Sequence, residues 1–157
     1  MSVLKEMRAV SKAEFVNTAG EIFDETVAFL SRLSARYSRL LAEKTADLAG
    51  EVMDEAEKAN SIFPSSLLRV DRREVHLLET RAALMALDVR LGRCYRLMMK
   101  NPQGAFTNSA GQNLPPKKAE EKLDNMAQKL GELIDKENDL LKGALDYVAK
   151  KRRELKK

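Results

Sequence analysis

The sequence predicts an all-α protein that folds as an antiparallel, up-down four-helix bundle. Hydrophobic residues make up 44% of its 157 residues, whereas aromatic residues make up 5% and tryptophan is absent. Alanine, leucine, glutamate, lysine and arginine dominate, and these residues favour long helices. Four amphipathic segments follow one another with mostly short connections, which is the pattern of a bundle. We expect one domain over residues 1–157, with an N-terminal arm at 1–10.

The first two helices are predicted within residues 12–61. Ser11 and Glu14 have the spacing of a capping box, which marks a helix start. A continuous helix over 12–61 would be about 75 Å long, too long for a compact domain, so we place a break near 34–39. Pro64 ends the second helix because proline cannot continue it. The two apolar stripes are Phe15, Ala19, Ile22, Phe23, Val27, Leu30 and Leu33, then Leu41, Thr45, Leu48, Val52, Met53, Ala56 and Ala59.

The third helix is predicted to begin near Asp71 and to carry two overlapping apolar stripes. Apolar surface this wide indicates burial against more than one neighbour or against another subunit. We therefore expect this helix to lie at the centre of the bundle and the protein to form oligomers. The stripes are Val75, Leu78, Ala82, Met85 and Val89, and Leu77, Leu84, Leu87, Leu91, Cys94 and Met98.

Residues 101–116 are uncharged and rich in turn formers, which predicts a long loop with Phe106 as its large apolar anchor. Loops of this length are usually functional or mobile. The fourth helix is predicted to begin at Pro115 and Pro116, because proline suits a first helical turn. A basic tail at 150–157 either extends this helix or frays from it.

Charge is distributed unevenly along the chain. Residues 12–63 carry six basic and ten acidic side chains (net −4), residues 69–100 carry eight and four (+4), and residues 142–157 carry seven and two (+5). Such segregation indicates a polyanionic partner, and guanidinium groups bind phosphate bidentately. A solvated face paired with acids of the first two helices would carry the same charges, so both interpretations stay open. The candidate nucleic-acid-binding residues are Arg69, Arg72, Arg73, Arg90, Arg93, Arg96, Lys100, Lys150, Lys151, Arg152 and Arg153.

The sequence contains no clear arrangement of residues that is typical of a catalytic site. His76, the only histidine, is interpreted as a partly packed boundary residue, and Cys94, the only cysteine, as a buried structural residue. One histidine cannot supply the two Glu-x-x-His motifs of a ferritin-like metal site. We therefore predict no catalytic residues, metal site or cofactor, and no enzymatic activity. The acids of the first two helices are interpreted as a solvated face: Glu21, Asp24, Glu25, Asp47, Glu51, Asp54, Glu55 and Glu57.

The predicted location is the cytoplasm. A single cysteine excludes an intrachain disulfide and fits a reducing compartment. The N-terminus has no apolar signal region and no apolar run approaches 18 residues, so we expect neither secretion nor a membrane partner.

Residues 20–145 resemble a known family of small four-helix bundles. The resemblance lies in 29–33 (FLSRL) with 36–39 (RYSR), in 48–60 (LAGEVMDEAEKAN), and in Arg72 and Arg73 followed by the spaced Leu77, Leu78, Glu79, Ala82, Leu84, Leu87 and Leu91. The pattern is similar to the accessory variability determinant proteins of diversity-generating retroelements, which have relatives encoded within 23S ribosomal RNA genes.

This resemblance implies a basic homopentamer that binds the reverse transcriptase and template RNA of the retroelement and is required for mutagenic reverse transcription. The matching basic residues are Arg72, Arg73, Arg90, Arg93 and Arg96. The acidic first hairpin and the long loop depart from the family pattern, which favours binding concentrated on the third helix and the tail. No sequence-reading element is recognisable, so RNA or DNA would be bound through its backbone. The alternative is a helical protein–protein interaction module with no nucleic-acid role, and a helical enzyme is the least favoured class.

Overall fold

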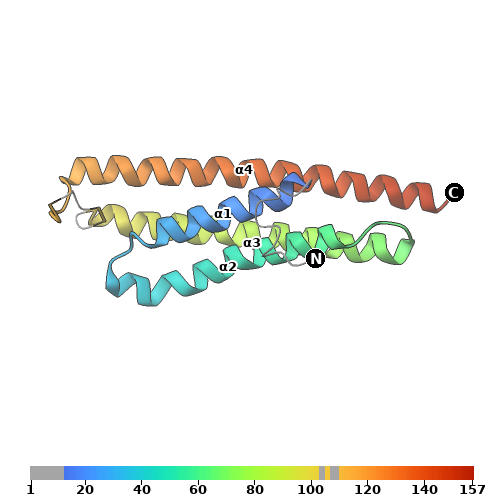
Figure 1. The fold of residues 1–157 in the computed structure, drawn as a ribbon, viewed down its shortest axis with the longest axis horizontal. Coiled ribbons are helices and arrows are strands. Elements are labelled where there is room, and N and C mark those ends of the chain that lie inside the picture. The colour runs from blue at the N-terminus through green and yellow to red at the C-terminus, as the bar shows by residue number, and fades with distance from the viewer. Residues whose placement is uncertain (1–12, 103–104, 107–109) are drawn as a thin grey trace.

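The protein is a bundle of four α-helices, seen here in a computed structural model that describes residues 13–102, 105–106 and 110–157 (Figure 1). The helices are α1 (Glu14–Leu30), α2 (Ala35–Ser61), α3 (Leu67–Lys100) and α4 (Pro116–Leu155). They alternate in direction, and α1 contacts α2 and α4 while α3 contacts the same two helices from the other side. The predicted fold class is confirmed.

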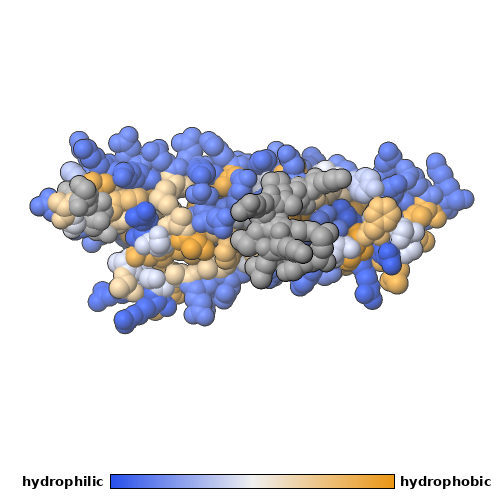
Figure 2. All heavy atoms as spheres, viewed as in Figure 1, coloured by the Kyte–Doolittle hydropathy of each residue, from blue (hydrophilic) through white to orange (hydrophobic). Residues whose placement is uncertain are grey.

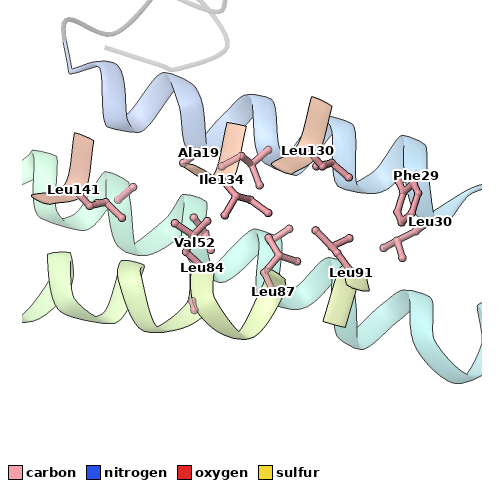
Figure 3. Packing of buried hydrophobic residues seen from close by; sticks show 14 of the residues in the cluster. Ala19, Phe29, Leu30, Val52, Leu84, Leu87, Leu91, Leu130, Ile134 and Leu141 are labelled. Atoms are coloured by element: carbon pink, nitrogen blue, oxygen red, sulfur yellow. The ribbon is translucent and has the colours of Figure 1, made fainter. Parts of the chain in front are cut away.

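The hydrophobic core lies along the central axis of the bundle. Because each helix repeats its apolar residues every three or four positions, one stripe of each faces inward. Burying one such aliphatic side chain contributes about 1.5–3 kcal/mol, so the core is the main source of stability. Figure 3 shows buried side chains from all four helices pointing toward one another: Ala19, Phe29 and Leu30 of α1, Val52 of α2, Leu84, Leu87 and Leu91 of α3, and Leu130, Ile134 and Leu141 of α4.

Serine side chains set two helix starts differently from the prediction. The break between α1 and α2 lies at 31–34, earlier than expected, because the Ser34 side chain accepts a hydrogen bond from the Tyr37 amide at 3.5 Å and begins α2 there. Likewise, α3 begins at Leu67 rather than near Asp71, since the Ser66 hydroxyl accepts from the Arg69 amide at 3.4 Å. Both are N-caps of the usual type.

The remaining boundaries agree with the sequence where they can be compared. Helix α4 begins at Pro116, as predicted, and continues through the basic tail to Leu155. Helix α1 begins at Glu14, whereas Ser11 of the predicted capping box and the expected arm at 1–10 lie outside the described residues.

The expectation that α3 lies at the centre of the bundle was wrong. Its inward stripe is buried, with Leu77, Leu84 and Leu87 fully inaccessible to solvent. The other stripe is not covered, since Val75 and Met85 are 54% and 55% exposed. In a ring of four helices each helix has two neighbours, so apolar surface wider than those two can cover remains on the outside.

The loop after α3 is held by Phe106, which is buried as its prediction as an anchor required. The Arg32 guanidinium lies 4.3 Å from the centroid of the Phe106 ring, and it also donates a hydrogen bond to the Ala105 carbonyl at 3.3 Å. Lys122 approaches the same ring at 5.3 Å. These cation–π contacts tie the described part of the 101–116 loop to the connection between α1 and α2 and to α4; residues 103–104 and 107–109 lie outside the described chain.

Candidate nucleic-acid interface

Four basic residues occupy the C-terminal half of α3. Arg93, Arg96 and Lys100 are exposed, and Arg90 is partly exposed. They are three or four positions apart, which places them along one side of the helix. None of the four forms an ion pair with a residue in the described part of the chain. We call these four residues the α3 basic cluster.

Arg69, Arg72 and Arg73 at the start of α3 do not have equivalent surroundings. Arg69 and Arg72 are exposed. Arg73 is partly buried and donates hydrogen bonds to the Ala59 and Ile62 carbonyls at 3.1 and 2.9 Å. Burial lowers the pKa of Arg73, and its guanidinium satisfies carbonyls at the end of α2, where a positive charge is favourable. The Arg73 Nη1 group is thus already used within the fold.

The basic residues of the C-terminal tail also differ in whether other residues of the fold already bind them. Arg152 bonds to Asp71 at 3.1 Å and also to Glu74, and hydrogen bonding to these carboxylates raises the pKa of Arg152. Lys151 pairs with Glu154 at 3.2 Å. Lys150 and Arg153 are exposed and have no ion-pair partner among the described residues.

The candidate residues therefore fall into two groups at opposite ends of α3. The Arg152 contacts bring the tail beside the start of α3, where Arg69 and Arg72 lie. Arg90 follows Arg72 by eighteen residues, which is about 27 Å along a helix. A polyanion that contacts both groups must extend along the helix.

Acidic residues mark a different side of the molecule. A groove on α2 is lined by Asp47, Glu51, Asp54 and Glu55 together with Lys58. This surface would repel a polyanion, so the field of the protein favours approach from the α3 side. In the view of Figure 2 the outer edge formed by α4 is hydrophilic, while hydrophobic side chains are visible at the end where α2 and α3 are joined.

His76 and Cys94, which were considered above as possible catalytic residues, have surroundings that fit a structural role. His76 lies 2.6 Å from a Glu55 carboxylate oxygen and is partly exposed, and Lys58 bonding lowers the pKa of Glu55. Cys94 is 1% exposed, as predicted for a structural cysteine, and burial raises the pKa of its thiol. Within the described residues no three histidine, cysteine or carboxylate side chains are grouped to hold a metal ion.

Glu137 is a buried ionisable residue that sequence analysis missed. Its side chain is inaccessible to solvent, and neither carboxylate oxygen has a hydrogen-bond partner among the described residues. Burial raises the pKa of Glu137 to about 8. The signal was present, because Glu137 lies three residues after Ile134 and four before Leu141, in phase with the inward stripe of α4. Its polar neighbours in sequence, Lys136 and Asn138, concealed it.

No family model matches this chain, and neither a curated protein nor a solved structure matches it. The resemblance to the accessory variability determinant family thus remains a prediction from the sequence pattern. No helix in the described part of the chain combines the length and apolarity that crossing a bilayer requires.

Proposed function

We propose that this protein is a non-enzymatic nucleic-acid-binding bundle that acts as an accessory factor to a reverse transcriptase. The observation that supports the nucleic-acid half is the α3 basic cluster, whose exposed guanidinium and ammonium groups have no acidic partner in the described chain. Several such groups along one side of a helix can each contact a phosphate and release its counterions. Arg69, Arg72, Lys150 and Arg153 are further exposed basic residues near the other end of α3.

The binding would be directed to the nucleic-acid backbone. Lysine and arginine on a helix exterior neutralise phosphates, whereas sequence is read by contacts to base edges in a groove. We therefore expect RNA and DNA to be bound with little sequence preference. Arg73 and Arg152 contribute through the fold, since their guanidinium groups are held by carbonyls and carboxylates.

The reverse-transcriptase half rests on the family resemblance of residues 20–145. The expected result is that the protein co-purifies with the reverse transcriptase of a diversity-generating retroelement and raises complementary-DNA synthesis from its template RNA. If the two proteins co-purify but complementary-DNA synthesis does not change, the result would support binding to the reverse transcriptase and not a role in synthesis.

A second candidate function is a protein–protein interaction module with no nucleic-acid role. The uncovered apolar stripe of α3 favours it, because large exposed apolar patches mark interaction sites. The two candidates differ in what charge reversal does, since only a phosphate-binding surface depends on the sign of the α3 basic cluster.

The test is binding of labelled structured RNA and duplex DNA by the wild type and by the Arg90→Glu/Arg93→Glu variant. With four phosphate contacts, raising salt from about 50 to about 200 mM weakens binding by roughly 100-fold, and the variant should lose most of its affinity even at the lower salt. The matched control is Arg36→Glu/Arg39→Glu, which makes the same change of charge at exposed positions of α2. Absence of binding at low salt, or equal losses in both variants, would count against the proposal.

A further inference from the structure

A pocket opens at the seam between α3 and α4, with a residue of α1 at its floor. Its volume is about 170 Å³, and every residue that lines it lies in a described helix. We call it the α3–α4 pocket. The floor is apolar and buried, and its four side chains are labelled in Figure 3: Phe29, Leu91, Leu130 and Ile134.

The volume of the α3–α4 pocket suits one aromatic ring. A cavity of about 150 Å³ that is lined by leucine, isoleucine and phenylalanine side chains holds benzene, whereas sites for drug-sized molecules have about 300–1,000 Å³. The pocket is therefore matched to a single side chain of a larger partner. Aromatic side chains that fill such pockets supply much of the binding energy at protein interfaces.

Two glycines from different helices keep the floor of the pocket accessible. Gly92 of α3 and Gly131 of α4 both line the pocket, and a Cβ atom at either position would meet no neighbouring atom within 4 Å. Packing between the helices therefore does not require glycine at these positions, although glycine destabilises a helix interior relative to alanine. What the two glycines provide is open space above the apolar floor.

The edge of the α3–α4 pocket is negatively charged. Asp88 lines the pocket and is exposed, and it forms no ion pair with a residue in the described part of the chain. Tyr95 also lines the pocket, and its hydroxyl donates a hydrogen bond to Asp124 of α4, which holds the ring in place. No lysine or arginine is among the lining residues. A carboxylate and an aromatic ring both attract a cation, so the edge favours a ring that has a positive charge beside it.

We propose that the α3–α4 pocket is the anchor site for an aromatic side chain of a partner protein, with a lysine or arginine of that partner beside it at Asp88. The ring would rest on the apolar floor between Gly92 and Gly131. The residues of the α3 basic cluster do not line this pocket. The inference therefore does not rest on nucleic-acid binding, and either proposal can fail without the other.

The first experiment is a titration of the full chain with three ring compounds of similar size, followed by NMR through the amide signals of Gly92 and Gly131. The probes are phenethylamine, phenethyl alcohol and phenylacetate, which are positively charged, neutral and negatively charged. We expect both signals to shift in a saturable way. Phenethylamine should bind roughly 3-fold more tightly than the alcohol, and phenylacetate roughly 3-fold less tightly, because one exposed charge pair contributes modestly. In Asp88→Asn the three probes should bind alike.

The second experiment fills the pocket with a side chain of the protein itself. Gly131→Leu should weaken phenethylamine binding by roughly tenfold or more, because burial of the ring supplies most of the affinity. The matched control is Gly143→Leu, at an exposed position of α4 where a Cβ atom also meets open space and which does not line the pocket. Both substitutions should raise the Tm by about 2–4 °C, since leucine favours a helix more than glycine does. Loss of binding in Gly131→Leu alone would then not come from unfolding.

The third experiment tests whether the occupant is a protein side chain. A phenylalanyl-lysine dipeptide with both ends blocked should shift the same two glycine signals, and phenylalanyl-glutamate should bind more weakly. No saturable shift, equal binding of the three probes to the wild type, or binding that Gly131→Leu leaves intact would overturn the proposal. Exclusion of the dipeptide while phenethylamine binds would assign the pocket to a free amine instead. A change of oligomeric state in Gly131→Leu, measured by light scattering, would assign it to a second copy of this chain, and either result would overturn the assignment to a partner protein.

Discussion

Replacing Glu137 with glutamine should change how the stability of the protein depends on pH. The Glu137 carboxyl is inaccessible to solvent and has no hydrogen-bond partner in the described part of the chain, and burial raises its pKa from 4.5 to about 8. A shift of that size corresponds to roughly 5 kcal/mol between the two protonation states. The buried carboxyl is thus protonated near neutral pH in the folded protein and ionised in the unfolded chain.

The direction of the pH effect follows from this difference in bound protons. Between pH 4.5 and about 8 the folded state holds a proton that the unfolded state has lost, so the free energy of unfolding falls as the pH rises through this window. Below pH 4.5 both states are protonated, and above about 8 both are ionised, so the contribution is constant at either side. Glu137→Gln carries no charge and lacks this dependence.

The assay is urea unfolding at a series of pH values, extrapolated to water. The free energy of unfolding of Glu137→Gln, relative to wild type, should increase by about 4 kcal/mol between pH 5 and pH 9. Glu121→Gln makes the same substitution at an exposed position of α4 and should follow the wild type. If the wild-type and Glu137→Gln curves run parallel over this range, the reasoning about the buried carboxyl is wrong.

Two further substitutions test contacts that hold chain segments in place. Arg73→Met keeps most of the side-chain length but removes the donors to the Ala59 and Ile62 carbonyls, so it should lower the free energy of unfolding by about 1–3 kcal/mol in the same urea assay; an unchanged midpoint would mean that water replaces the guanidinium without cost. Phe106→Ala removes the buried ring beneath Arg32 and should cost about 3 kcal/mol, with faster proteolysis within 101–116. Equal cleavage rates would show that the ring does not hold the loop.

The fold could be predicted because the helical periodicity of the apolar residues is strong in every segment. The boundaries were predicted well where the residue permits one outcome, as Pro116 does at the first turn of α4. The observed helix starts differ from the predicted ones where several serines could each act as the N-cap. Ser34 and Ser66 begin α2 and α3 through hydrogen bonds to amides three residues on, and the sequence contains other serines nearby that could have done the same.

The candidate site could be predicted only as a set of charges. Which arginines are accessible depends on contacts between segments far apart in the chain, such as Arg152 with Asp71 or Arg73 with the Ala59 carbonyl. The two apolar stripes of α3 were visible in the sequence, but which of them faces the core is decided by the packing of α2 and α4. Residue type and spacing do not contain that information.

The burial of Cys94 makes this protein a convenient host for spectroscopic labels. A thiol that is 1% exposed and whose pKa is raised by burial reacts slowly with thiol-directed reagents. A cysteine introduced on the surface can therefore be labelled selectively while the native cysteine stays in place. A spin label or fluorophore at the solvent-facing positions of α3 then reports on the surroundings of that face in the intact protein, without altering its core.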